Sequence, residues 1–167
     1  MDPGTTSCFN NLIVNSGTTT LTNALNATNL AGNLTVVGGT LNNGGLAITG
    51  NAGATFQVNN GTTFVLTGTS AMPTGFGTTT LQATSTVNFN GSGAQTIPAM
   101  NFGNLTSSST GTRTLASAGT IGIAGTFTPG TNVYTITGST ADFNGGAEQA
   151  IPAFNYNNLT SSSTGTR

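Results

Sequence analysis

The chain has 167 residues, of which two are basic, three are acidic and none is histidine. Soluble domains carry roughly a quarter charged residues, whereas this chain carries 3%. Two arginines cannot supply the basic surface that nucleic-acid binding requires. Histidine chemistry is excluded, and the single Cys8 cannot form an intrachain disulfide or a thiolate zinc site. We therefore expect no nucleic-acid partner, no cofactor and no metal.

Residues 1–7 have neither the basic nor the apolar region of a signal peptide. We interpret them as an added start or as a leader into the first repeat, and we expect 8–167 to form one continuous repeat array. No apolar run is long enough for a membrane-spanning helix, so no membrane insertion is expected. The longest stretch without Gly or Pro, 18–31, is mostly Thr and Asn, which are weak helix formers.

Short apolar pairs that straddle one residue recur along the chain, which is the two-residue period of a β-strand. These pairs are Leu34/Val36, Leu46/Ile48, Phe56/Val58, Phe64/Leu66, Ile121/Ile123 and Tyr134/Ile136. Gly, Asn or Pro falls between most of them and supplies the backbone angles of tight turns. The 35% of hydrophobic residues is enough for a narrow core. The pattern predicts many short strands separated by Gly- and Asn-rich turns.

An internal repeat joins 89–113 to 143–167 at an offset of 54 in the numbering, and 18 of the 25 aligned positions are identical. The shared frame reads Phe-Asn-Gly, Gln, Ile-Pro-Ala and an aromatic residue, then Asn-Leu-Thr-Ser-Ser-Ser-Thr-Gly-Thr-Arg. A unit therefore occupies 89–142 and restarts at 143–167, where it is truncated. Repeat arrays usually end in an atypical cap. We expect the chain to be a slice of a longer repeat protein.

Two all-β architectures fit this pattern. The first is a parallel β-solenoid, in which rungs of two or three short strands stack about 4.8 Å apart and each repeat unit holds two or three rungs. The alternative is a series of β-sandwich repeats with hairpins. The small core, the Asn-rich turns that can stack as ladders and the 7% of aromatic residues favour the solenoid.

The frame of Phe-Asn-Gly, Gln-x-Ile-Pro and aromatic-x-Asn-Leu, followed by a Thr/Ser/Gly run, resembles the β-strand repeats of very large secreted surface proteins of Bacteroidetes bacteria. The resemblance is closest over 85–167 and looser over 8–70. It implies a structural segment of an adhesin or extracellular filament, exported and anchored by a separate module. The implied location is secreted or at the bacterial cell surface. The implied partners are neighbouring repeats or further copies of the chain, with cell-surface or glycan contacts.

A polysaccharide-cleaving enzyme would need paired carboxylates. The acids are Asp2, Asp142 and Glu148, and the positions equivalent to the last two in the other copy are Asn88 and Ala94. Scattered solvating charges explain these acids better than a catalytic pair does. We expect no enzymatic activity.

Recurring Thr-x-Thr motifs suggest an interaction face. Its candidate residues are Thr110, Thr112, Arg113, Thr114, Thr126, Thr128, Thr135 and Thr137. Aligned Thr pairs on a flat solenoid face can order water as ice does, so an ice-binding β-solenoid is the alternative function, although the intervals between these motifs are irregular. Thr is also simply a common outward-facing strand residue. The equivalent Arg113 and Arg167 either bind an anion or serve as solubilising charges that discourage sheet addition at an edge.

Overall fold

The computed structural model describes residues 8–167, and within that range it contains strands and turns but no helix. Every strand pairing is parallel. The chain is a β-solenoid of about seven turns, which confirms the predicted solenoid, because a sandwich of hairpins would pair antiparallel. No element of the described range could cross a membrane as a helix. The interpretation of residues 1–7 lies outside the described residues.

Each turn of the solenoid visits three sides in the same order. The first side holds two four-stranded sheets, β1 (Leu12–Val14), β3 (Leu34–Val36), β5 (Thr55–Val58) and β7 (Thr78–Leu81), and then β10 (Asn101–Phe102), β13 (Ile121–Ile123), β16 (Thr140–Phe143) and β17 (Asn158–Thr160). The second side is a six-stranded sheet of β2 (Thr18–Thr20), β4 (Thr40–Asn42), β6 (Thr63–Leu66), β8 (Thr86–Phe89), β11 (Asn104–Ser107) and β14 (Phe127–Thr128). The third side holds β9 (Gln95–Ile97), β12 (Arg113–Leu115) and β15 (Tyr134–Thr135).

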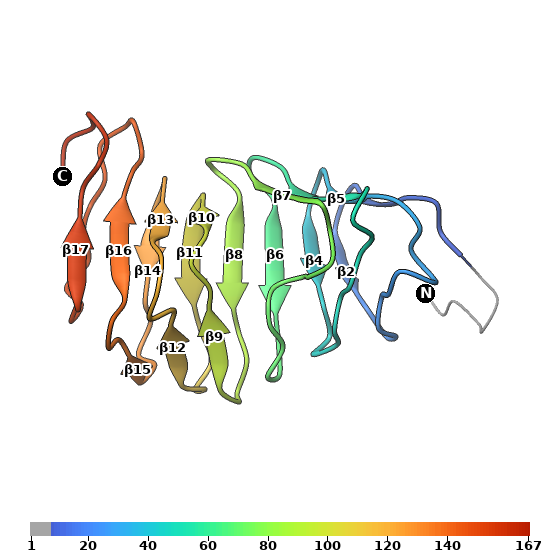
Figure 1. Cartoon of the computed structure of the whole chain (residues 1–167), viewed down its shortest axis with the longest axis horizontal. Helices are drawn as coiled ribbons and strands as arrows, with labels where there is room; N and C mark the ends of the chain where they lie inside the picture. The colour runs from blue at the N-terminus through green and yellow to red at the C-terminus, as the bar shows by residue number, and fades with distance from the viewer. Residues whose placement is uncertain (1–7) are drawn as a thin grey trace.

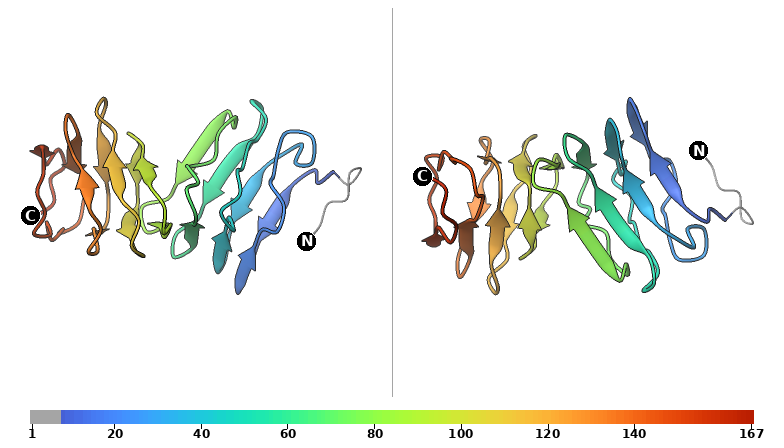
Figure 2. Two further views of the ribbon diagram at one scale, coloured as in Figure 1. Left: turned by 90° about the horizontal axis from the view of Figure 1, so that it is seen from below. Right: turned by 90° about the horizontal axis from the view of Figure 1, so that it is seen from above.

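The strands follow one another along the long axis, with β2 near one end and β17 at the other (Figure 1). The same succession is seen from above and below (Figure 2). On the third side, the early turns have only isolated bridges, Leu25 with Ile48 and Thr49 with Thr74. The predicted strand at Leu46/Ile48 is therefore reduced to a single bridge, because the apolar pair is set among Gly and Asn turns.

Turn length varies without disturbing the stack. One turn runs from Leu12 to its partner Leu34, whereas a shorter one runs from Thr86 to its partner Asn104. The corners absorb the difference, and glycines such as Gly61, at φ 72°, make the corner between the first and second sides. Only glycine adopts such an angle without steric cost. Uniform strand register is thus compatible with irregular spacing in the sequence.

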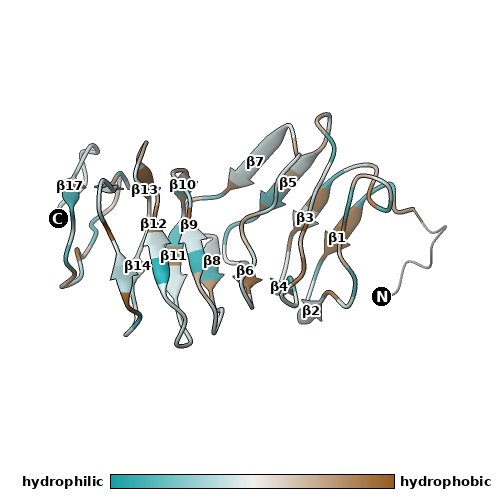
Figure 3. Cartoon of the chain, turned by 60° about the horizontal axis from the view of Figure 1, so that its bottom comes forward, coloured by the Kyte–Doolittle hydropathy of each residue, from teal (hydrophilic) through white to brown (hydrophobic). Residues whose placement is uncertain are grey.

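The core is one column of alternate side chains inside the three sides. In β5 and β6 every second residue is buried, and Phe56 and Phe64 pack edge to face with their ring centroids 5.1 Å apart. Hydrophobic residues are prominent on β1, β3, β6 and β13 (Figure 3). The predicted two-residue period therefore marks the inward positions of these strands.

Asparagine side chains tie one turn to the next. Oδ1 of Asn11 accepts the backbone N–H of Asn33 at 2.8 Å, and Oδ1 of Asn33 in turn accepts the N–H of Thr55 at 2.8 Å. Asn104 accepts the N–H of Thr126 in the same way at 2.9 Å. These bonds satisfy backbone donors at corners where the ladder is interrupted.

The sequence repeat does not correspond to a whole number of turns. By sequence β16 is equivalent to β8, and it lies eight strands later along the chain. With three strands in each turn, eight strands make two and two-thirds turns. The second copy is consequently displaced by one side, since β8 lies in the six-stranded sheet and β16 lies on the first side.

Candidate functional site

The most unusual site inside the solenoid is a polar column on the third side. Gln95, Arg113 and Tyr134 are directly paired across β9, β12 and β15, and all three point inward. The neighbouring column, formed by Ile97 and Leu115, is apolar. An arginine, a glutamine and a tyrosine thus occupy positions that hydrocarbon side chains fill elsewhere in the core.

Arg113 is completely buried, with 0% of its surface exposed. Its Nη2 donates to the carbonyl oxygens of Phe89, Gly91 and Ser108 at 2.8, 2.9 and 2.7 Å. Its Nη1 donates to the carbonyls of Thr112 at 3.0 Å and Gly93 at 3.3 Å.

The remaining donor of this guanidinium, Nε, bonds to the Ser107 hydroxyl at 2.9 Å, and that hydroxyl donates to Oδ1 of Asn132 at 2.9 Å. The planar fork of arginine suits such a ring of acceptors better than lysine does. The six acceptors are neutral oxygens, so the charge is held by dipoles in place of a carboxylate.

Burial shifts the titration of two members of the column. Desolvation lowers the pKa of Arg113 below its usual value, and the adjacent Tyr134 acts in the opposite direction. Burial raises the pKa of Tyr134, while its contacts with Ser107 and Arg113 act in the opposite direction. The Tyr134 hydroxyl donates to the Pro129 carbonyl at 2.9 Å. Both groups act as hydrogen-bond donors in the structure.

The second copy of the repeat rebuilds this arrangement on another side. Nη2 of Arg167 donates to the carbonyls of Phe143 and Gly145 at 2.6 and 3.2 Å. Oε1 of Gln149 accepts the N–H of Gly145 at 2.8 Å, as Oε1 of Gln95 accepts that of Gly91 at 2.9 Å. In the second copy Nε of Arg167 is buried without a partner.

Aromatic packing is repeated as well. The ring centroids of Phe89 and Phe102 lie 6.3 Å apart with 72° between the ring planes, and those of Phe143 and Tyr156 lie 6.2 Å apart with 77° between them. Phe102 and Tyr156 are equivalent in the repeat. The two copies therefore build the same edge-to-face contact beside the arginine.

The glycine at the start of the Gly-Thr-Arg motif makes room for the guanidinium. A Cβ on Gly111 would overlap the carbonyl oxygen of Gly93 and would come within 2.6 Å of Nη1 of Arg113. The shared Gly-Thr-Arg sequence therefore marks a close backbone approach around the arginine, which is buried at Arg113 and half-buried at Arg167.

The structure corrects the prediction for Arg113. Its side chain cannot belong to an exposed interaction face, and it is neither a solubilising charge nor an edge residue, because no part of it reaches solvent. Sequence reasoning missed its role because a buried arginine usually has an acidic partner, and no acid lies at a suitable position in the repeat.

The seven threonines of the predicted face are all exposed, but they belong to different sides. Thr114 and Thr135 are neighbours in register on the third side, and Thr96 extends the same column. Thr126 and Thr128 belong to the second side, where Thr128 pairs with Thr106. Thr110, Thr112 and Thr137 lie outside the strands. The structure thus places four of the predicted threonines on two separate surfaces and the other three outside the strands.

A larger polar surface, of which the sequence predicted only Thr126 and Thr128, covers the outer face of the six-stranded sheet. Its first column is Thr18, Thr40, Thr63, Thr86, Asn104 and Thr126, and its second column is Thr20, Asn42, Val65, Asn88, Thr106 and Thr128. We call these twelve residues the threonine–asparagine face. Only the strand register, which the irregular sequence intervals conceal, reveals it.

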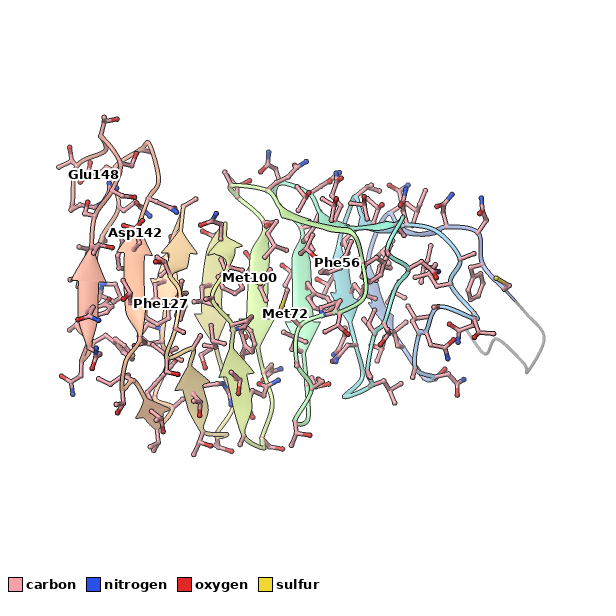
Figure 4. All side chains as sticks on the ribbon, viewed as in Figure 1. Phe56, Met72, Met100, Phe127, Asp142 and Glu148 are labelled. Atoms are coloured by element: carbon pink, nitrogen blue, oxygen red, sulfur yellow. The ribbon has the colours of Figure 1, made fainter. Side chains whose placement is uncertain are left out.

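The two described acids lie in different surroundings. Asp142, on β16, is buried and accepts hydrogen bonds from the Thr160 hydroxyl at 3.0 Å and the Ser162 hydroxyl at 2.5 Å. Glu148 is exposed in the loop beyond that strand (Figure 4). Within residues 8–167, no group of three or more His, Cys, Asp or Glu side chains could hold a metal ion.

The solenoid was compared with protein-family models, with curated proteins and with solved structures. None of the three comparisons finds a match.

Proposed function

We propose that the chain is a structural repeat segment of a secreted or cell-surface adhesin or extracellular fibre, acting as a rigid, neutral β rod. One observation supports it above all, namely parallel sheets that overlap along the chain, the second side running unbroken from β2 to β14 and the first side continuing from β10 to β17. Each turn is bonded to the next through backbone groups on its sides and through asparagine side chains at its corners. Such a stack resists bending because any bend must break several bonds at once.

The neutral surface supports the same role. Among the described residues the charged side chains are two acids and two arginines, and one of those arginines is fully buried. In a parallel stack, a charge at the same position of every turn would form a column of like charges that repel one another. Thr and Asn stack without that repulsion. The proposal includes no catalytic activity.

The partners that we propose are neighbouring repeats of the same longer chain or further copies of it. Within the described residues, β17 pairs with β16 alone, so its other edge offers backbone groups to another rung. Cell-surface glycans are a further partner class. A shallow pocket lined by Tyr134, Phe154 and Asn155 offers aromatic rings and an amide to a sugar.

The proposed location is tested with antibodies raised against the purified chain. We expect them to label intact, unpermeabilised cells of the source organism or fibres outside those cells in immuno-electron microscopy. Cells lacking the gene are the control. Labelling that appears only after permeabilisation would overturn the proposal.

A further inference from the structure

The threonine–asparagine face is unusually uniform for a protein surface. Of its twelve positions, eight are Thr, three are Asn and one is Val. The single apolar residue, Val65, has the branched shape of threonine without its hydroxyl. All twelve side chains are uncharged, and the six strands that carry them lie side by side along the long axis (Figure 1).

The face is also regular in space. Parallel strands lie about 4.8 Å apart, and residues two apart on a strand are about 6.6 Å apart. The face is therefore a grid of two columns and six rows. Along the first column, the step from Thr86 to Asn104 is shorter in sequence than the step from Thr63 to Thr86. The corners absorb this difference, so that the rows stay aligned although the motif intervals are irregular.

The side chains on this face are restrained before any ligand arrives. β-branched threonine has few χ1 rotamers. The asparagines are held by neighbours, because Oδ1 of Asn88 accepts the Ser108 hydroxyl at 2.8 Å and Nδ2 of Asn104 donates to Oγ1 of Thr86 at 3.4 Å. A surface with so little rotamer freedom loses little entropy when it binds an equally regular partner.

From this geometry we infer that the threonine–asparagine face binds ice. A grid of hydroxyls, amides and methyl groups can hold a layer of ordered water that continues into an ice lattice, whereas charged side chains would impose hydration shells of their own. A crystalline polysaccharide is the competing flat partner. Its sugar rings stack on aromatic side chains, and the face has none. The inference depends on the fold and goes beyond the proposed function. Ice binding can therefore be disproved while the structural role stands, and the structural role can be disproved while ice binding stands.

The test uses the full chain in assays of thermal hysteresis and of ice-recrystallisation inhibition. The variant Thr63→Tyr places a bulky ring in the middle of the grid. The matched control is Thr114→Tyr, which changes the central residue of the Thr96–Thr114–Thr135 column on the third side. Circular dichroism and thermal unfolding verify that both variants fold.

We expect the wild-type chain and Thr114→Tyr to inhibit recrystallisation equally, and Thr63→Tyr to lose this activity. An inactive wild-type chain overturns the inference, as does an equal loss in both variants. Binding to insoluble cellulose or chitin that Thr63→Tyr abolishes, without any effect on ice, would overturn it in favour of a polysaccharide partner.

Discussion

At the scale of single residues, the buried arginine is the most informative feature of the molecule. Arg113 organises carbonyl groups from three segments of the chain, at Phe89–Gly93, at Ser108 and at Thr112. Without the guanidinium these carbonyls would lie in the interior with fewer partners, and an unsatisfied buried acceptor costs about 1–3 kcal/mol. Arg113 therefore acts as an internal clamp between neighbouring turns.

Replacing the clamp is expected to destabilise the fold strongly. Arg113→Ala should lower the free energy of unfolding by about 3 kcal/mol or more. Arg113→Lys should lower the free energy of unfolding by an intermediate amount, because a single ammonium cannot reach all the carbonyls. Urea unfolding followed by circular dichroism measures both. Thr112→Ala, at the exposed neighbouring position, is the control, and a midpoint for Arg113→Ala equal to that of the control would contradict the clamp.

Tyr156 gives the fold a dependence on alkaline pH. Burial raises the pKa of Tyr156 to about 12, from 10.0 in an exposed tyrosine. The protonated phenol is therefore favoured in the folded state. Its contribution to stability is complete below the unfolded pKa of 10.0 and is lost as pH rises through the folded value of about 12.

The free energy of unfolding of the wild-type chain, measured between pH 10.0 and about 12, should fall as pH rises. The free energy of unfolding of Tyr156→Phe should fall less steeply over the same range. The ultraviolet spectrum of phenolate in the folded protein reports the ionisation directly. If Tyr134 and Tyr156 both ionised with the ordinary tyrosine pKa of 10.0, the raised pKa of Tyr156 would be contradicted.

At the scale of the strand, inward and outward positions differ sharply in what they contribute. Phe64 of β6 is fully buried against Phe56, whereas its neighbour Val65 belongs to the threonine–asparagine face. Adjacent residues of one strand therefore serve the core and the surface separately.

This difference can be measured within β6. Phe64→Ala should cost about 3–5 kcal/mol of unfolding free energy, because it opens a cavity in a narrow core. Val65→Ala should change it by about 0.5 kcal/mol or less. Thermal and urea unfolding of the two variants make the comparison. Similar losses of unfolding free energy in Phe64→Ala and Val65→Ala would contradict the alternation of buried and outward-facing residues along β6.

Strand periodicity explains why the architecture could be predicted while the sites could not. Pairs such as Phe56/Val58 and Ile121/Ile123 reveal inward positions from the sequence alone, because their period is a local property of a strand. The partner of each strand is not local. It depends on turn lengths that differ along the chain, so the alignment of Thr40 with Thr63 became evident only in three dimensions.

At the scale of the whole molecule, the mismatch between the repeat and the turns governs what each copy displays. A unit of two and two-thirds turns moves every equivalent residue to another side of the rod. A row of such units would bring a residue back to its original side only at every third copy. Duplicating this sequence therefore does not duplicate a surface.

Identity between the two copies consequently has a different meaning from identity in a binding array. A residue kept in both copies has to suit two different sides, which is true of the clamp arginine and its glycine, and not of a docking residue. Exposed positions at which the copies differ, such as Ala94 and Glu148, are free to adapt to whatever that side meets. For a protein of this design, the positions that diverge between copies are the first place to look for recognition.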